Sequence, residues 1–140
     1  MNTNTKASDI MSSNLKKIKG SDTINDAFKA MNNAKIHHLL VVNDKDQLIG
    51  VVSDRDIKKI MSPFIGSKFE KPQDKATLLV KIEGVMSKKV ESCSSEATLK
   101  NCIELMLQKV IHSVPIINEE GKLVGIVTAT DVLKKFLGYL

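Results

Sequence analysis

The feature that most constrains the fold is an internal repeat. Residues 48–56 read Leu-Ile-Gly-Val-Val-Ser-Asp-Arg-Asp, and residues 123–131 read Leu-Val-Gly-Ile-Val-Thr-Ala-Thr-Asp. Both stretches have an apolar pair, a glycine, a second apolar pair, a hydroxyl residue, two variable positions and an aspartate. An apolar run that ends at a capping residue predicts a buried strand leading directly into a helix.

The start of each predicted helix is a candidate binding site. Ser53 and Thr128 are placed to cap the helices, and Asp56 and Asp131 follow three residues later, on the same side. Free N–H groups and the helix dipole favour an anion such as phosphate there. A carboxylate beside a phosphate suits the diol of a ribose. The alternative is that the aspartates bind no ligand and only interact favourably with the positive end of the helix dipole.

The rest of each copy repeats as well. Residues 15–18 and 90–93 read as short strands, and a helix follows each of them; Thr23 and Asp26 have the spacing of a capping box. Residues 36–43 and 111–118 read as buried strands, each joined by a tight turn to the signature strand. The order strand, helix, strand, strand, helix, read twice, predicts an α/β (α+β) fold with two domains.

Four segments follow from this reading. Residues 1–8 are expected to be a flexible leader, 9–61 the first domain, 62–84 a linker or insertion with a short helix, and 85–140 the second domain. Proline and glycine mark the insertion as loop. Its apolar residues Phe64, Ile65 and Phe69 predict that it packs onto the body or onto a partner.

Composition excludes several classes of protein. No apolar run is long enough to span a bilayer, and residues 1–6 lack a signal-peptide core, so we expect a cytoplasmic protein without a membrane partner. The net charge of +5 comes from scattered lysines without interleaved aromatic residues, which argues against nucleic acid. Cys93 and Cys102 are expected to be buried apolar side chains.

The histidines do not predict a metal site. His37 and His38 are adjacent on a strand and point to opposite faces. No carboxylate or cysteine stands at a supporting spacing to them or to His112.

Two motifs of the repeat resemble those of a known family. The first is His112-x-x-Pro115 before the second strand of a copy. The second, after the third strand, is a glycine followed by two apolar residues, Ser or Thr, two variable residues and Asp. On the basis of these two motifs, the repeat resembles a tandem pair of CBS domains, the Bateman module. The resemblance covers residues 9–139, apart from the insertion at about 62–82. It implies two domains packed about a pseudo-twofold axis, with two clefts for adenine nucleotides.

The resemblance also implies which residues meet in the clefts. One cleft would hold Ser53, Arg55, Asp56, His112, Ser113, Val114 and Pro115, with Glu91 at its edge. The other would hold Thr128, Thr130, Asp131, His37, His38, Leu39 and Leu40, with Lys16. The two aspartates would accept hydrogen bonds from ribose hydroxyls, the two hydroxyl residues would donate to phosphate, and apolar residues would sandwich the adenine.

The two clefts differ. Leu40 stands where the second copy has Pro115, which would loosen that wall, and Glu91 would repel an anion where Lys16 would attract one. Arg55 provides a guanidinium for phosphate in one cleft only. Because it stands between two aspartates, the alternative to phosphate contact is a local ion pair with one of them. These differences leave the clefts unranked.

The resemblance implies a regulatory module without a required cofactor. An adenine nucleotide (AMP, ADP, ATP or a related adenosyl compound) would change domain or dimer packing, and an unknown effector protein would respond. The family implies a homodimer. A scaffold without a ligand is the alternative, favoured by Leu40, Ala129 and Glu91. A small enzyme is not expected, because the sequence has no nucleophile elbow, phosphate loop or metal cage.

Overall fold

The computed structural model describes residues 4–140 and divides into two compact units. The first unit contains residues 16–90, and the second contains residues 4–15 together with 91–140. Each unit has a three-stranded sheet with helices beside it, so the predicted α/β class is confirmed. Within residues 4–140 no helix combines the length and the apolar character needed to cross a bilayer.

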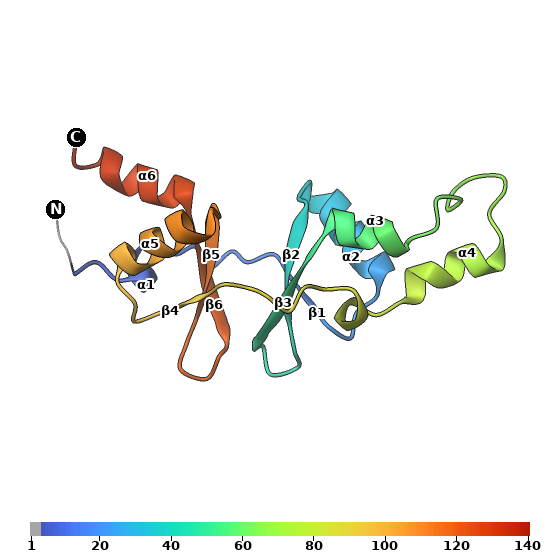
Figure 1. The fold of residues 1–140 in the computed structure, drawn as a ribbon, viewed down its shortest axis with the longest axis horizontal. Helices are drawn as coiled ribbons and strands as arrows, with labels where there is room; N and C mark the ends of the chain where they lie inside the picture. Colours follow the sequence, from blue (N-terminus) through green and yellow to red (C-terminus); the bar gives the residue numbers. More distant parts are fainter. Residues whose placement is uncertain (1–3) are drawn as a thin grey trace. The chain divides into compact units, whose positions relative to one another are not determined.

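The first unit follows the predicted order of elements (Figure 1). Its elements are β1 (Lys17–Lys19), α2 (Ile24–Ala34), β2 (His38–Val42), β3 (Leu48–Ser53), α3 (Asp54–Ile60) and α4 (Pro72–Ala76), followed by 3-10 turns at Thr77–Leu79 and Ile82–Gly84. Strand β2 lies in the middle of the sheet, parallel to β1 and antiparallel to β3. The core is aliphatic, with Ile24, Val41 and Val52 fully buried.

The second unit repeats the arrangement. It contains α1 (Ala7–Ile10), β4 (Cys93–Ser94), α5 (Leu99–Lys109), β5 (Ser113–Ile117), β6 (Leu123–Thr128) and α6 (Ala129–Leu137). Strand β5 lies between β4 and β6, with the same parallel and antiparallel neighbours as β2. The caps predicted at Thr23, Ser53 and Thr128 are confirmed, because each side chain accepts a hydrogen bond from the third helical N–H.

The folding units are not the consecutive copies of the repeat. Ser12, from the start of the first copy, pairs with Ile126 on β6, the edge strand of the second unit. Ser87, from the start of the second copy, pairs with Val51 on β3 of the first unit. The expected boundaries at residues 9 and 85 therefore differ from the units, which change at residues 15–16 and 90–91.

The glycine of each signature strand accommodates this exchange. A Cβ atom on Gly50 would lie 2.6 Å from the carbonyl oxygen of Ser87, and one on Gly125 would meet the side chain of Met11. A side chain at either position would push the crossing segment away from the strand. The repeated glycine is thus explained by close approach of another segment.

The predicted flexible leader needs a correction. Residues 1–3 lie outside the described residues, but Ala7 is fully buried at the start of α1. The N–H of Ala7 donates to the carbonyl of Ala97 at 2.8 Å, and the N–H of Leu99 donates to the carbonyl of Thr5 at 2.8 Å. Residues 5–8 are therefore part of the second unit.

The insertion is held at its ends and exposed at its tip. Ser62 Oγ donates to Asp74 Oδ1 at 2.8 Å, and the N–H of Ser62 donates to Thr77 Oγ1 at 3.1 Å. Phe64 and Phe69 remain 50% and 64% exposed, so these two side chains do not pack onto the body, and the alternative that they pack onto a partner stays a prediction.

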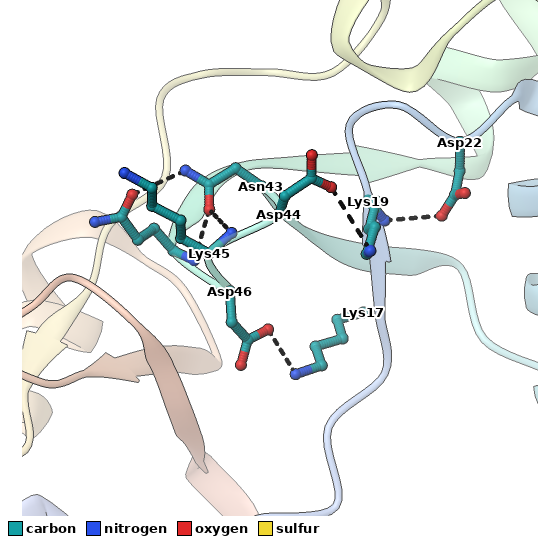
Figure 2. A network of polar contacts seen from close by, with 8 residues as sticks. Lys17, Lys19, Asp22, Asn43, Asp44, Lys45 and Asp46 are labelled. Atoms are coloured by element: carbon teal, nitrogen blue, oxygen red, sulfur yellow. Dashed lines mark hydrogen bonds and ion pairs between the residues drawn. The ribbon is translucent and has the colours of Figure 1, made fainter.

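The turn of the first hairpin is tied to the edge strand β1 (Figure 2). Lys17 Nζ lies 2.7 Å from Asp46 Oδ1, and Lys19 Nζ lies 3.6 Å from Asp44 Oδ1. Exposed ion pairs of this kind contribute about 0–1 kcal/mol each, so they orient the turn more than they stabilise the unit. Two of the scattered lysines thus have carboxylate partners.

The two cysteines differ in burial. Cys102 on α5 is fully buried, as predicted, whereas Cys93 on β4 is only partly buried. Burial raises the pKa of the Cys102 thiol to about 12, and a hydrogen bond with the Cys93 thiol acts in the same direction.

This shift predicts how stability depends on alkaline pH. In the unfolded chain the Cys102 thiol has its ordinary pKa of 9.0, so its contribution to folding is fully present below that pH and is lost as the pH rises towards 12. Urea denaturation at pH 8 and at about pH 11 should show a larger loss of stability for the wild type than for Cys102→Ala. Equal losses would contradict the buried neutral thiol.

Candidate functional site

The two helix starts that follow the signature strands have nearly identical geometry. Ser53 Oγ accepts from the N–H of Asp56 at 3.1 Å, and Asp56 Oδ2 accepts from the N–H of Ser53 at 2.9 Å. Thr128 and Asp131 make the same two bonds at 3.1 and 2.9 Å. Each pair therefore forms a reciprocal capping box, a structural role for the aspartates that goes beyond the expected interaction with the helix dipole.

The capping boxes leave bonding capacity for a ligand. They use the acceptor side of each hydroxyl and one carboxylate oxygen, so the hydroxyl proton and Oδ1 take no part in them. Ser53, Asp56, Thr128 and Asp131 are all partly exposed. Each helix start can therefore offer one donor and one charged acceptor to a bound molecule.

The backbone N–H groups at these starts are less free than the sequence suggested. The N–H of Asp54 donates to the carbonyl of His37 at 2.8 Å, and the N–H of Ala129 donates to the carbonyl of His112 at 2.8 Å. The third N–H of each helix is bound by the cap hydroxyl. Only the second N–H, that of Arg55 or Thr130, takes no part in these bonds.

The first unit has a polar contact at its helix start that the second unit lacks. His37 Nδ1 lies 3.1 Å from Asp54 Oδ2, and Lys58 Nζ lies 3.9 Å from the same oxygen. The hydrogen bond from His37 lowers the pKa of Asp54, and the N–H of Arg55 adds to the effect. Ala129 replaces Asp54 in the second copy, so no carboxylate competes there for the N–H of Thr130.

Sequence reasoning missed the contact between His37 and Asp54. Seventeen positions separate the two residues, and no periodic pattern joins them. The one available signal was the hairpin register, which sets His38 opposite Ser53 and therefore brings their neighbours together.

The strand residues assigned to the clefts differ in burial, and Pro115 is buried beside Val114. Leu39 is 2% exposed and Val114 is fully buried, and both belong to the cores of their units. Because their side chains are packed in the core, only the backbone groups of these two residues can contact a ligand. His38 and Ser113 are exposed and lie opposite the cap residues Ser53 and Thr128.

Leu40 and Pro115 change how the neighbouring strand pairs. The N–H of Leu40 donates to the carbonyl of Lys16 at 3.3 Å, which ties β1 to β2 rather than loosening this wall. Pro115 has no N–H to offer. Strand β4 accordingly starts at Cys93, one position later than β1 does in its copy, and Glu91 instead forms an ion pair with Lys109 at 3.7 Å.

The remaining candidates are exposed. Lys16, Arg55, Thr130 and His112 all lie at the surface of their units. Among the ion pairs of residues 4–140 none involves Arg55, so the predicted competition from its neighbouring aspartates does not occur. In the same part of the chain, no group of three or more His, Cys, Asp and Glu side chains is arranged to hold a metal ion.

The structure thus groups the candidates by unit. The first unit brings together Lys16, His37, His38, Leu39, Leu40, Ser53, Arg55 and Asp56. The second brings together Glu91, His112, Ser113, Val114, Pro115, Thr128, Thr130 and Asp131. Each unit therefore holds half of each predicted cleft.

Comparison with known proteins identifies the repeat. The family model for the CBS domain matches twice, over residues 7–63 and 82–138. The chain belongs to the CBS-domain family. The capped helix start with its aspartate is thus a feature of both CBS domains of this chain, and each match also includes the segment that crosses to the other unit.

Similar proteins include both short and long chains. A crystal structure of CBSX2 in complex with AMP is 26% identical, has a TM-score of 0.75, and is covered over 98% of its length by 96% of this chain. A CBS domain-containing protein of Dictyostelium discoideum is 29% identical over 89% of this chain and 86% of its own length. Inosine-5'-monophosphate dehydrogenase of Methanocaldococcus jannaschii is 28% identical over 93% of this chain, which spans only 23% of the dehydrogenase.

Proposed function

We propose that this CBS pair is a regulatory module of the cytoplasm that binds an adenine nucleotide. The observation that carries the proposal is the repeated pair of a cap hydroxyl and an aspartate, each with unused bonding capacity at a partly exposed helix start. The similarity to CBSX2, whose structure contains AMP, supports an adenosine ligand.

The ligand contacts follow from the chemistry of the two halves. Oδ1 of Asp56 or Asp131 accepts from the ribose hydroxyls, and the hydroxyl of Ser53 or Thr128 donates to phosphate. Within each cleft the opposite wall is the segment 37–40 or 112–115. Since Leu39, Val114 and Pro115 are buried, the adenine contacts in this segment come from backbone groups and from the flanking side chains of His38, Leu40 and Ser113.

We rank the cleft built on Thr128 and Asp131 first. The N–H of Thr130 has no neighbouring carboxylate that competes with a ligand for it. The N–H of Arg55, in contrast, interacts with the carboxylate of Asp54. In the proposed arrangement Lys16 adds a positive charge to the first-ranked cleft. The cleft built on Asp56 has Arg55 and Glu91, and the ion pair with Lys109 offsets the charge of Glu91.

Regulation requires that the nucleotide favour one arrangement of the domains over another. A ligand shifts such an equilibrium only by its difference in affinity for the two arrangements. The nucleotide would thereby change the packing of the domains or of a homodimer, and an effector protein would bind differently to the changed arrangement. The alternative, a scaffold without a ligand, is favoured by the N–H groups that the protein already occupies at both helix starts.

The first test separates ligand contact from helix capping. We expect calorimetric titration with AMP, ADP, ATP and S-adenosylmethionine to detect binding, and Asp131→Asn to weaken it by about 10- to 100-fold because a charge-assisted hydrogen bond is lost. Asp56→Asn should have this effect only if the other cleft also binds. Asparagine keeps an oxygen that can accept from the cap N–H.

Asp26→Asn is the matched control. Asp26 has the same place in the capping box of α2, where its Oδ2 accepts from the N–H of Thr23 at 2.9 Å, but it lies outside both proposed clefts. It should lose comparable stability and keep full affinity. If folded wild-type protein binds no compound of the panel, the scaffold replaces the nucleotide module, and turnover of a bound nucleotide would indicate an enzyme.

A further inference from the structure

The insertion of the first unit has a groove of its own. It lies between the loop that carries Phe64 and Phe69 and the start of α4, and it has a volume of about 540 Å³. None of its lining residues belongs to the predicted clefts. Residues 64–81 also lie outside both matches of the CBS model, so the groove is an addition to the domain.

Short-range hydrogen bonds order the loop around this groove. The N–H of Ser67 donates to the carbonyl of Phe64 at 3.0 Å, and Ser67 Oγ donates to the same oxygen at 2.7 Å. The N–H of Phe69 donates to Ser67 Oγ at 3.1 Å, and the N–H of Gly66 donates to Glu70 Oε1 at 3.2 Å. A ligand can therefore bind without the cost of ordering the loop first.

Both phenylalanines are exposed on this ordered loop. They take no part in the core of the first unit, whereas Leu78 from the same insertion packs against it. Aromatic side chains are enriched in the cores of protein interfaces, because they bury a large apolar area with little loss of side-chain entropy. The groove that the two phenylalanines line can thus take an apolar side chain of a partner.

The two carboxylates of the groove are used by the insertion itself. Glu70 pairs with Lys75 at 3.6 Å, and its side chain is only 22% exposed. Asp74 accepts from the Ser62 hydroxyl and from the N–H of Lys71, both at 2.8 Å. These two bonds, the N–H of Lys71 first, lower the pKa of Asp74, and the more distant charge of Lys71 adds to the effect. Neither carboxylate needs a cation from a partner.

The two lysines that line the groove are not used in this way. Lys68 and Lys71 are exposed and take part in none of the ion pairs found within residues 4–140. Lys68 Nζ lies 5.4 Å from the centre of the Phe69 ring, so a positive charge stands beside an aromatic anchor. Carboxylates of a partner would be attracted to these two lysines. The charge of the groove therefore fits an acidic segment.

Shape and charge favour a polypeptide over a membrane surface. A loop that enters a bilayer presents a protruding apolar tip and avoids carboxylates. Here the phenylalanines line a concavity that also contains Glu70 and Asp74. Entry into a bilayer would desolvate both carboxylates, whereas a peptide side chain can enter the groove and leave their bonds in place.

We propose that this groove binds an acidic segment of the effector protein. An apolar side chain of that segment contacts Phe64 and Phe69, and its carboxylates lie against Lys68 and Lys71. The proposal rests on the proposed function only in naming the bound protein as the effector of this CBS pair. Peptide binding and nucleotide binding are therefore measured separately.

Selection from a random peptide library displayed on phage tests the groove without knowledge of the effector. The full chain is immobilised without nucleotide. Wild-type protein should enrich peptides in which a leucine or an aromatic residue stands beside several acidic residues. Phe64→Ser combined with Phe69→Ser should not enrich them.

Fluorescence anisotropy with the most enriched peptide gives the size of the effect. The Phe64 and Phe69 double variant should bind it about 10- to 100-fold more weakly, as expected for the loss of aromatic anchors. Lys68→Glu combined with Lys71→Glu should weaken binding by about 10-fold in low salt and remove most of its salt dependence. All four side chains are exposed, so both variants should fold, with unchanged circular dichroism spectra.

Leu79→Ser, and Lys88→Glu combined with Lys89→Glu, are the controls. Leu79 is exposed in the same insertion, and the two lysines are exposed in the same unit, but none of them lines the groove. These variants should keep full affinity for the peptide.

Failure of the wild type to enrich acidic peptides, or enrichment that the Phe64 and Phe69 double variant shares, would overturn the proposal. So would binding to phosphatidylserine vesicles that needs both phenylalanines when no peptide binds. A wild type that binds the peptide but no adenine nucleotide would support the groove and contradict the proposed function instead.

Discussion

Gly50→Ala should destabilise the protein by about 2–3 kcal/mol, although it adds only one methyl group. The new Cβ would lie 2.6 Å from the carbonyl oxygen of Ser87 and 2.8 Å from the sulfur of Met86. The segment must move away, which breaks the two hydrogen bonds between Val51 and Ser87, at 3.0 and 2.9 Å. Chemical denaturation, followed by circular dichroism, measures the change.

Gly84→Ala is the control for this substitution. Gly84 belongs to the same unit, and a Cβ there would meet no atom within 4 Å. Replacing it should change stability by less than about 0.5 kcal/mol or increase it slightly, because alanine restricts the unfolded chain. If both variants lose the same stability, the crossing segment does not pack against Gly50 as described.

Ile82→Ala should cost about 2–5 kcal/mol, as expected for a core isoleucine. Ile82 lies at the end of the segment expected to be a linker, yet it is fully buried in the core of the first unit with Ile24 and Val41. Its N–H also donates to the carbonyl of Asp22 at 2.8 Å. Urea denaturation, compared with Ile24→Ala, measures whether the two residues contribute equally.

Leu79→Ala separates this effect from a general effect of the linker. Leu79 lies three residues before Ile82 and is 70% exposed, so its loss should change stability by less than about 0.5 kcal/mol. If Ile82→Ala is as stable as Leu79→Ala, the end of the insertion is a linker and does not contribute to the core of the first unit.

The order of elements could be predicted because it depends on local patterns. Four consecutive apolar residues before Asn43 or Asn118, and capping residues at helical spacing, gave the strands and helix starts of both units. The caps at Ser53 and Thr128 followed from the same spacing, whereas the reciprocal bonds of Asp56 and Asp131 were not predicted. These features depend on residues at most a few positions apart.

The exchange of segments could not be predicted in this way. Ser12 and Ile126 pair although they lie at opposite ends of the chain, and nothing in either residue identifies its partner. Gly50 and Gly125 leave room for the crossing segments, but nothing in the repeated motif identifies those segments. Likewise, the carbonyls of His37 and His112 reduce the free N–H groups at the helix starts through backbone contacts that carry no side-chain pattern.

The exchange also means that cleavage in the insertion would not separate the protein into two domains. A cut near Gly66, on the exposed loop, would leave an N-terminal fragment that holds residues 4–15 of the second unit and a C-terminal fragment that holds residues 67–90 of the first. Each fragment would keep all three strands of its sheet, but the first core would lack Ile82 and the second would lack Ala7. The two halves are therefore suited to reconstitution as a split protein, in which folding of each half reports that the other is present.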